Sequence, residues 1–578
     1  MLAAEASVLE TDVAVIGSGG AGLMAALHTK RRDPALSVTV VSKGAVGRSG
    51  CTRMVQGGFN AALGDEDSIE AHFRDTIEGG QFLNDQELAW DLVSQAPALI
   101  GELESAFGCL FDRTDDGRIR LKAFGGQTHF RTVHRGDQTG LEIMGRLRDQ
   151  LFRYEITELE HWRALDLVFD LDGELSGFTA LDTVSGRPAV VCARVVVVAT
   201  GGAATMYRVA APALEKTGDG AAMCYRAGLE LRDMEMLQFH PTGLVAGSSA
   251  LTGSVLEEGL RGAGATLVNA HGERFMERYD PVRLERSTRD LVARASYIEI
   301  AEGRGTPAGG VLLDISHLGA SEIERRFKGM VERTRLIGSD LASEPIEVCP
   351  TAHFQMGGVV IDRDCATEVA GLLVAGEDAG GVHGANRLGG NGVAESIVFG
   401  ARAGDRAAEA ASDRALVRPN NESVQRSLAR TFAPLGRTTG STPAPLYDRL
   451  KDVMWERCGL VRERSSLLGA QEVLVGLEDE ARTASAPGAL ELNSAWQQLL
   501  DLQNQLAVAR VMVESALARE ESRGAHYRSD FPEEDNENWL RIVRARASAD
   551  GTEIVTRTEP VELTRMRPAD DLVHGEAG

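Results

Sequence analysis

A glycine-rich turn between an apolar segment and a helical segment lies close to the N-terminus. Residues 11–16 have the apolar character of a buried strand and lead into Gly17-Ser18-Gly19-Gly20-Ala21-Gly22; an Ala- and Leu-rich stretch follows and ends near Pro34. This order is typical of a dinucleotide site, because the glycines let the backbone approach a pyrophosphate and the helix N-terminus attracts its charge. We therefore predict a Rossmann-like α/β domain whose dinucleotide-binding residues are Gly17, Gly19, Gly20 and Gly22.

The end of the next apolar strand, residues 38–41, indicates which dinucleotide is bound. In NAD-binding domains an Asp or Glu at this point binds the ribose hydroxyls. Here the strand is followed by Ser42-Lys43, which carries no carboxylate. We therefore expect FAD rather than NAD, with Ser42 and Lys43 among the residues that contact it.

Length and composition limit the remaining possibilities. A chain of 578 residues is long enough for two to four domains and for an interior that encloses a large cofactor. No apolar run approaches the roughly 20 residues of a membrane-spanning helix, and the first residues lack the pattern of a secretory signal. The formal net charge of -24 argues against binding to nucleic acid or anionic lipid, since both select clustered Lys and Arg. We expect a cytoplasmic protein without direct membrane insertion.

The seven cysteines are scattered along the chain and form no C-x-x-C pair. This usage is typical of a reducing compartment and predicts neither an iron-sulfur nor a zinc site, so we expect no bound metal. Electrons for a redox reaction would then come from another chain or from a diffusible carrier.

Alternating apolar residues over 162–192 predict a three-stranded antiparallel meander, with turns at Asp172-Gly173 and at Ser185-Gly186-Arg187-Pro188. Residues 194–200 are expected to form a further strand that returns to the parallel sheet. Such an excursion from the parallel sheet is typical of flavoproteins with two dinucleotide-binding folds.

Other regions differ in composition from these sheet-forming parts. Residues 241–344 mix helical and strand patterns and are rich in charge, as expected of an inserted lid. Beyond residue 424 apolar residues recur at three- and four-residue steps, most regularly over 495–520, which indicates a helical bundle. The predicted divisions are an FAD-binding domain at 1–240 and 345–420, a capping domain at 241–344, a helical domain at 421–540 and a tail at 541–578 that lies over the body or over a partner.

Further motifs follow in a fixed order along nearly the whole chain. They are Gln56-Gly57-Gly58, Asp137-Gln138-Thr139-Gly140, Ala199-Thr200-Gly201-Gly202, Thr217-Gly218-Asp219-Gly220, Gln238-Phe239-His240-Pro241-Thr242-Gly243, His271-Gly272-Glu273-Arg274-Phe275, Thr288-Arg289-Asp290, His353-Phe354-Gln355-Met356-Gly357-Gly358, His383-Gly384-Ala385-Asn386-Arg387-Leu388-Gly389-Gly390-Asn391 and Ser522-Arg523-Gly524-Ala525-His526. In this set and order the chain resembles the flavoprotein subunit of succinate dehydrogenase and fumarate reductase, with aspartate oxidase as a close relative. The resemblance implies an α/β fold with a two-dinucleotide-binding-fold FAD domain, an inserted α+β capping domain and a C-terminal helical domain.

Interconverting succinate and fumarate requires groups that hold two carboxylates, a flavin N5 that exchanges hydride, and a group that moves a proton at the neighbouring carbon. The resemblance implies that Arg289 moves this proton and that Glu258 and Arg261 connect it to solvent. Such resupply is needed because a guanidinium in water stays protonated. Taken alone, Arg289-Asp290 would be read as a structural ion pair. The implied substrate-binding residues are His240, Thr242, His353, Arg387 and Phe124.

The resemblance also implies a set of cofactor-binding residues beyond the first glycine turn. Glu377, after an apolar strand at 372–375, fits a role in holding the sugar or ribityl hydroxyls of FAD. The remaining implied residues are Ser49, Gly50, Cys51, Thr52, Gln56, Gly57, Gly58, Thr200, Gly201, Asp219 and Asn391.

The chain departs from this family where most succinate dehydrogenases have a histidine that bonds covalently to the flavin. Gly50 and Cys51 occupy that region, with one additional residue. We therefore expect non-covalent FAD, although a bond through Cys51 stays open. In this family non-covalent FAD has a lower potential, which favours fumarate reduction over succinate oxidation.

A second departure concerns the substrate. The family usually has Thr or Ser before its Glu-Gly pair, where this chain has Glu257. A carboxylate that faces a substrate carboxylate repels it unless it is protonated or turned away. Either Glu257 points elsewhere, or the substrate is not a simple four-carbon diacid. A pocket that has decayed, leaving a non-catalytic flavin electron-relay subunit, is a further alternative.

Phe124 distinguishes between the relatives. Aspartate oxidase has a Glu at this position to bind the substrate ammonium group, whereas the succinate and fumarate enzymes have an aromatic residue. Phe124 therefore favours an unsubstituted dicarboxylate over L-aspartate as substrate.

The resemblance finally implies partners. We expect an iron-sulfur subunit that conducts electrons, an indirect link through it to a membrane quinone module, and a small dicarboxylate as substrate. The protein would then lie at the inner face of the cell membrane, attached only through its partner subunits.

Overall fold

The predicted strand, glycine turn and helix are present in the computed structural model, which describes residues 6–549 and 551–568. Strand β1 (Ser7–Ile16) runs parallel to β2 (Val38–Ser42), with Val13 opposite Val38, and helix α1 (Gly20–Arg32) connects them. The inner half of β1 and all of β2 are buried, because their apolar and β-branched side chains are covered on both faces of the sheet. The dinucleotide turn therefore sits at the carboxyl edge of a parallel sheet.

The sheet that contains β1 and β2 is mixed and has seven strands, in the order β6-β2-β1-β9-β8-β7, with β16 also paired to β9. Strands β6, β2, β1, β9 and β16 are mutually parallel, whereas β8 and β7 continue as an antiparallel meander. The further strands are β6 (Thr157–Glu160), β7 (Trp162–Phe169), β8 (Leu175–Asp182), β9 (Pro188–Val198) and β16 (Leu372–Val374).

One strand differs from the prediction. The third meander strand and the returning strand are a single strand, β9, which pairs with β8 through its first half and runs parallel to β1 over its whole length. No Gly, Pro or turn residue interrupts residues 189–198, and nearly all of them are buried. Without a breaker the backbone stays extended across the predicted junction.

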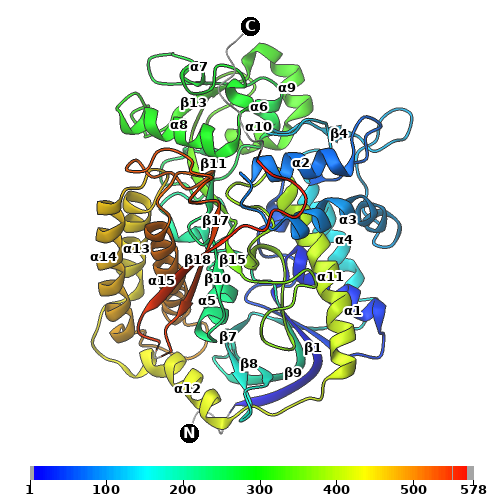
Figure 1. Ribbon diagram of the computed structural model, residues 1–578, viewed down its shortest axis with the longest axis vertical. Helices are drawn as coiled ribbons and strands as arrows, with labels where there is room; N and C mark the ends of the chain where they lie inside the picture. The colour runs from blue at the N-terminus through cyan, green and yellow to red at the C-terminus, as the bar shows by residue number, and fades with distance from the viewer. Residues whose placement is uncertain (1–5, 550, 569–578) are drawn as a thin grey trace.

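Helix α11 (Asn391–Asp413) packs along α1 at one side of the sheet (Figure 1). The two helices approach closely because α11 carries Gly400 and Gly404, where an added Cβ would lie 2.6 Å and 2.4 Å from the α1 backbone. Four more helices belong to this part of the chain: α2 (Ile69–Gly79), α3 (Gln86–Ser105), α4 (Thr139–Leu151) and α5 (Asp219–Arg226). A small sheet there consists of β3 (Phe59–Asn60), β5 (Thr132–Val133) and β4 (Leu121–Lys122).

A second sheet, in the order β11-β14-β13-β12, carries the capping region at the top of Figure 1 and has its own apolar core. The long strands β11 and β14 connect it to the FAD-binding part, so the predicted divide at 240/241 falls inside β11. The elements are β11 (Leu237–Leu244), β12 (Thr266–Val268), β13 (Val311–Asp314), β14 (Ile346–Gln355), α6 (Gly259–Gly262), α7 (Met276–Tyr279), α8 (Arg289–Ala301), α9 (Ala320–Arg326) and α10 (Lys328–Arg335).

The predicted helical region forms a group of long helices at the left of Figure 1, where α13, α14 and α15 lie side by side. The helix expected at 495–520 is α15, which begins after the capping residue Asn493. The helices are α12 (Asn421–Phe432), α13 (Pro443–Arg457), α14 (Arg464–Thr483) and α15 (Ser494–Ala518).

Within the predicted tail, residues 541–549 and 551–568 are described and contact the rest of the chain. Strands β17 (Arg541–Ala547) and β18 (Ile554–Pro560) form a hairpin whose first strand pairs with β10 (Leu231–Arg232), which in turn pairs with β15 (Gly358–Val359). Residues 564–566 then bind Gln86 and Glu87 on α3. Residues 569–578 of the predicted tail, like 1–5, lie outside the described residues.

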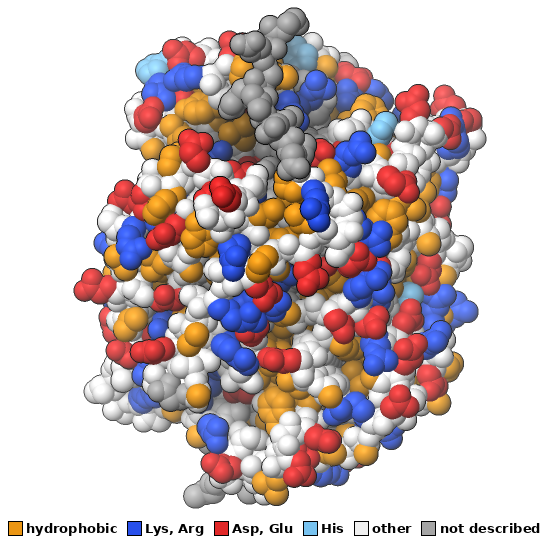
Figure 2. Space-filling view, in the orientation of Figure 1, with side chains coloured by type: hydrophobic (Ala, Val, Ile, Leu, Met, Phe, Trp, Pro, Cys, Tyr) orange, Lys and Arg blue, Asp and Glu red, His pale blue; other side chains and the backbone are white. Residues whose placement is uncertain are grey.

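Charged side chains of both signs are interspersed over the face of the molecule shown in Figure 2. Within the described part of the chain, no helix combines the length and apolar character needed to cross a membrane. Short 3-10 turns connect the helices and strands. They are η2 (Thr52–Met54), η3 (Ala204–Met206), η4 (Leu284–Arg286), η5 (Ser316–Leu318), η6 (Gly376–Asp378) and η7 (Ala433–Gly436).

Candidate active site

A cavity of about 780 Å³ extends from the glycine turn after β1 to the underside of the capping region. Most of the residues predicted from the sequence line it, although they come from distant parts of the chain. The lining includes Gly17, Gly19, Gly20, Ser42, Lys43, Ser49, Gly50, Cys51, Thr52, Gln56, Gly57, Gly58, Phe124, Thr200, Gly201, Asp219, His240, Glu258, Arg289, His353, Glu377 and Arg387.

The glycine turn fits a dinucleotide phosphate. Gly17 has φ +107°, and a Cβ there would lie 2.0 Å from the carbonyl oxygen of Ala199. Gly22 does not line the cavity; a Cβ on it would lie 2.0 Å from the Gly17 oxygen, so it lets α1 pack against the turn. The N-cap residue Gly19 provides no side-chain acceptor, the Gly20 N–H donates to the Thr52 hydroxyl at 3.1 Å, and the first turn of α1 carries no acidic residue. Its N-terminus is therefore available to an anion.

The end of the cavity near β2 is strongly ion-paired. Lys43 Nζ lies 2.7 Å from Asp219 and 3.0 Å from Asp501, while Ser42 receives a hydrogen bond from Ser18. Burial would raise the pKa of Asp219, but Lys43 and Arg163 outweigh it and hold the pKa below its usual range. The charges of Lys43 and Arg163 are therefore balanced by the carboxylates of Asp219 and Asp501. The wall of the cavity that would face a nucleotide is near neutral here.

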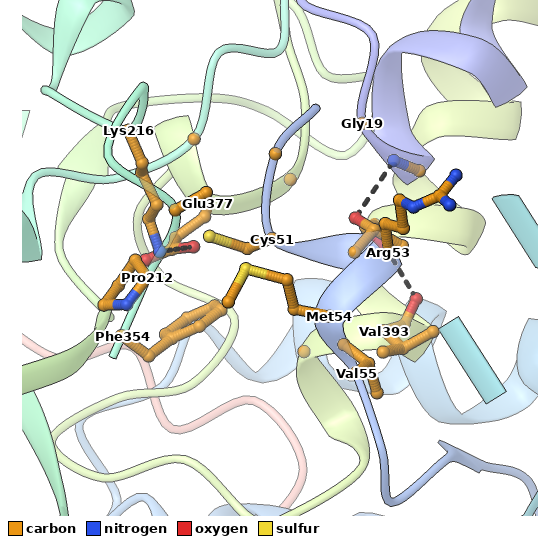
Figure 3. Close-up of a pocket in the computed structure, with 18 of the residues that line it drawn as sticks. Gly19, Cys51, Arg53, Met54, Val55, Pro212, Lys216, Phe354, Glu377 and Val393 are labelled. Carbon is orange, nitrogen blue, oxygen red and sulfur yellow. Dashed lines mark hydrogen bonds and ion pairs between the residues drawn. The ribbon is translucent and has the colours of Figure 1, made fainter. Parts of the chain in front are cut away.

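The loop around Cys51 faces a second ion pair (Figure 3). The Cys51 and Met54 side chains point toward Lys216, Glu377 and Phe354. Lys216 Nζ lies 2.5 Å from a Glu377 oxygen, and both groups line the cavity. Burial raises the pKa of the Cys51 thiol, although Lys216 opposes this effect. The thiol is thus neutral at neutral pH.

The far end of the cavity collects cationic and imidazole groups. The rings of His240 and His353 lie 5.4 Å apart, and burial together with the neighbouring arginines lowers the pKa of both rings well below its usual value. Arg387 lies 4.4 Å from the Phe354 ring, and its Nε has no hydrogen-bond partner among the described residues. Burial and Arg289 lower the pKa of Arg387 to about 9. We call His240, His353, Arg289 and Arg387 the anion pole.

A chain of buried ion pairs leads away from this pole. Arg289 donates to Glu258 through Nε at 2.8 Å and through a terminal nitrogen at 2.5 Å, and Arg261 lies 3.1 Å from the other Glu258 oxygen. Burial would raise the pKa of Glu258, but Arg289 and Arg261 outweigh it and lower the pKa. Arg289 also donates to Gln238 at 3.1 Å. The predicted relay residues are therefore in direct contact.

Three other predicted residues do not line the cavity. Thr242 donates its hydroxyl proton to the carbonyl oxygen of Leu256, and Arg261 lies behind Glu258. The Asn391 side chain joins a buried network with Asn60 and His72 beneath the start of α11. These side chains support the wall from behind.

Lys216 and Phe354 are among the lining residues that the sequence did not indicate. Lys216 directly precedes the recognised Thr217-Gly218-Asp219-Gly220 motif, and Phe354 lies inside the motif that begins at His353. Both could have been inferred from their position in these motifs, but an isolated Lys or Phe carries no chemical signature. Phe354 contacts both Arg387 and Lys216, so it separates two buried cations.

Glu257 lines the cavity but turns toward a different set of groups. Its carboxylate oxygens each lie 3.5 Å from Lys122 Nζ. Burial raises its pKa, Lys122 opposes the rise, and Asp137 and Arg326 are its other charged neighbours. Among the described residues, no group of His, Cys, Asp or Glu side chains is placed to hold a metal ion.

Comparisons with known proteins show which families the chain is similar to. A family model described as FAD binding domain matches residues 12–393, and one described as fumarate reductase flavoprotein C-term matches residues 447–572. The chain is therefore similar to flavoprotein families over most of its length.

Individual relatives cover nearly the whole chain. One component of the fumarate reductase (CoM/CoB) of Methanothermobacter marburgensis is 43% identical over 544 residues, which are 93% of this chain and 97% of that protein. The fumarate reductase flavoprotein subunit of Mycobacterium tuberculosis is 36% identical over 97% of this chain and 98% of that protein. A solved mutant of Escherichia coli quinol fumarate reductase superposes with a TM-score of 0.93 at 33% identity, over 99% of this chain and 100% of that chain.

Proposed function

Because the chain belongs to the family of fumarate reductase and succinate dehydrogenase flavoprotein subunits, we propose that it interconverts fumarate and succinate and works mainly as a fumarate reductase. FAD is its cofactor, and FAD supplies the hydride exchange of this reaction when bound. The observation that carries the proposal is the contact of Arg289 with Glu258 at the edge of the anion pole.

The anion pole supports binding of a small dicarboxylate. Arg387 has a buried Nε without a partner among the described residues, and a guanidinium binds a carboxylate through two parallel hydrogen bonds. His240 and His353 are neutral because their pKa values are lowered, so they can donate N–H bonds without adding charge. The dianion thus meets two guanidinium charges, of which one is already shared with Glu258.

Arg289 supplies the proton at the reacting carbon in this proposal. Its guanidinium is buried, and Glu258 keeps it oriented toward the cavity through two hydrogen bonds. A proton lost from Arg289 can be replaced through Glu258, which also contacts Arg261. In the direction of succinate oxidation the same groups remove the proton.

Residues of the glycine turn, the loop at 49–58 and Glu377 would hold FAD without a covalent bond in this proposal. No histidine occurs between residues 29 and 71, so the usual covalent ligand of the family is absent from this loop. Non-covalent attachment is the basis for proposing fumarate reduction as the favoured direction. If acid-precipitated protein releases its yellow flavin into the supernatant, attachment is non-covalent; flavin retained in the pellet would contradict it.

Phe124 makes L-aspartate a poor substrate. Its ring lines the cavity close to Gly57, where an added Cβ would lie 2.4 Å from it, and it offers no carboxylate to bind the substrate ammonium group. The alternative of a decayed relay subunit was raised by Glu257. The contact of Glu257 with Lys122 argues against this alternative, because the cations of the anion pole then stay available to a dicarboxylate.

We further propose that electrons reach this protein through an iron-sulfur partner, with an indirect link to a membrane quinone module. The protein would then be cytoplasmic and peripheral at the inner face of the membrane. Two relatives differ here, because one is named for CoM/CoB and another for quinol. The partner subunits, rather than this chain, therefore select the electron donor.

The decisive experiment measures both directions on the same purified FAD-loaded protein with artificial dyes. We expect fumarate reduction with a reduced viologen to exceed succinate oxidation with an oxidised dye. L-Aspartate with oxygen serves as the control and should give no turnover. Turnover of neither diacid, together with no change of the flavin spectrum at millimolar fumarate, would contradict the proposed function.

A further inference from the structure

Two adjacent glutamates line the cavity and have opposite surroundings. Glu257 and Glu258 are each only 3% exposed. Glu258 contacts Arg289 and Arg261, whereas the charged neighbours of Glu257 are Lys122, Asp137 and Arg326. The Glu258 carboxylate thus belongs to the relay, whereas the Glu257 carboxylate lies among a separate set of charged side chains.

A single short segment of the chain contacts both glutamates. Lys122, at the end of β4, places Nζ 3.5 Å from both oxygens of Glu257 and donates to the carbonyl oxygen of Gly136 at 2.8 Å. Three residues later the backbone N–H of Gly125 donates to Glu258 at 3.2 Å. The Gly136 contact fixes the ammonium group, so its position does not depend on Glu257 alone.

The position of Glu257 matters because it shares the cavity with the anion pole. A carboxylate turned toward Arg289 and Arg387 would neutralise the charges that bind a dianion, and it would repel the substrate. Asp137 is a further charged neighbour of Glu257 and repels it. Without Lys122, Arg326 is the remaining cation among these neighbours, and the repulsion from Asp137 favours rotation of Glu257 toward Arg289 and Arg387.

We propose that Lys122 is a positioning residue that holds the Glu257 carboxylate out of the anion pole and thereby sets the affinity for the dicarboxylate. The inference rests on the proposed function, since it concerns the same dianion. Lys122 touches neither the reacting atoms nor the relay, so it acts on binding rather than on proton transfer. Its removal raises KM and leaves kcat nearly unchanged.

The test uses FAD-loaded protein and two readouts, the dissociation constant of fumarate from the change in the flavin spectrum and the split between KM and kcat. K122M should weaken fumarate binding about tenfold or more. K122R keeps a cation next to Glu257 and should bind fumarate nearly as wild type does. The matched control is K328M, which removes the same charge from an exposed lysine paired with Glu332 on α10 and should change neither readout.

The double variant K122M/E257Q separates positioning from direct attraction. If Lys122 acts through Glu257, the neutral amide removes the repulsion, and fumarate affinity returns to near the wild-type value. If Lys122 attracts the substrate directly, the double variant stays as weak as K122M, which overturns the inference. Wild-type affinity in K122M overturns it as well.

Folding and the proposed function are checked separately. Flavin content and melting temperature show whether each variant is intact. If K122M loses FAD, recovery of both FAD and fumarate affinity in K122M/E257Q supports the inference, and failure to recover either contradicts it. Wild-type protein that neither binds nor reduces fumarate refutes the proposed function, whereas active wild type with an unaffected K122M refutes the positioning role alone.

Discussion

Buried charged side chains in this protein are held by specific ion pairs and hydrogen bonds. Arg289 shares its guanidinium with Glu258 and Gln238, and all three side chains are almost fully buried. A buried ion pair stabilises a protein only when its geometry is good, because the attraction has to offset the cost of removing both charges from water. Substitutions at such residues should therefore have large and specific effects.

Replacement of Arg289 should abolish turnover and spare the cofactor. R289Q removes the acid, and R289K cannot form the two bonds to Glu258, so both should lower kcat by about a hundredfold or more, the usual range for a lost general acid. Turnover with dyes and flavin content are measured on the same samples. Substantial activity in a folded, flavin-loaded R289Q would refute the assigned role.

Buried His72 should make the fold sensitive to acid. Its Nε2 lies 3.0 Å from the Asn391 amide oxygen, its Nδ1 has no partner among the described residues, and burial lowers its pKa to about 3. The unfolded chain takes up a proton near pH 6.5 and the folded chain does not, so this contribution is present above pH 6.5 and is lost as the pH falls below it.

We expect the free energy of unfolding of the wild type to fall by about 2 kcal/mol more than that of H72Q between pH 7.5 and 5, at about 1.4 kcal/mol per pH unit below 6.5. Urea titrations at the two pH values measure the difference. An equal loss in both proteins would show that His72 does not titrate on unfolding.

At the scale of elements, close backbone contacts fix where the cofactor site forms. The turn after β1 brings Gly17 against Ala199 at the end of β9, and Gly22 brings α1 against the turn. Both contacts leave no room for a Cβ. The sheet register and the first turn of α1 therefore depend on each other.

Gly22→Ala should separate this requirement from helix propensity. The new Cβ would lie 2.0 Å from the Gly17 oxygen, so α1 must shift, and we expect destabilisation of about 1–3 kcal/mol together with reduced FAD content. The matched control is Gly101→Ala in α3, where the space is open and alanine should stabilise by about 0.5–1 kcal/mol. Melting temperature and flavin-to-protein ratio measure both effects. A fully loaded G22A would contradict the packing argument.

At the scale of the whole molecule, one arginine joins three regions. Arg519 follows α15 and contacts Glu235 at 2.7 Å, Asp233 at 3.3 Å and Glu521 at 2.9 Å. It also donates to the carbonyl oxygen of Arg541 at the start of β17. The helical region, the C-terminal hairpin and the base of the capping sheet therefore meet at one buried guanidinium.

R519M should destabilise the protein by about 3–5 kcal/mol, because it leaves the buried carboxylate of Glu235 without a cation, whereas Asp233 keeps Arg232 and Glu521 keeps Arg523. The matched control is R449M, which breaks the exposed pair with Glu480 and should change stability by less than about 1 kcal/mol. Denaturant midpoints of the two variants are compared. Equal effects would show that burial does not govern these pairs.

The sequence by itself determined the features of this protein that depend on neighbouring residues along the chain. Gly17 and Gly22 have to be glycine where strand and helix meet, and the motifs from Gln56 to His526 place the chain in its family and identify FAD as its cofactor. The helix at 495–520 was found from its apolar periodicity and the strand at 38–41 from its apolar run, because both patterns are local. These features need no knowledge of distant residues.

Only the tertiary structure decided the directions of individual side chains. Glu257 turns to Lys122, which lies 135 residues away in sequence, and Asn391 turns to His72, 319 residues away. Thr242 faces the protein rather than the cavity for the same reason. Such directions follow from packing and charge among segments that meet only after folding, and no spacing along the chain encodes them.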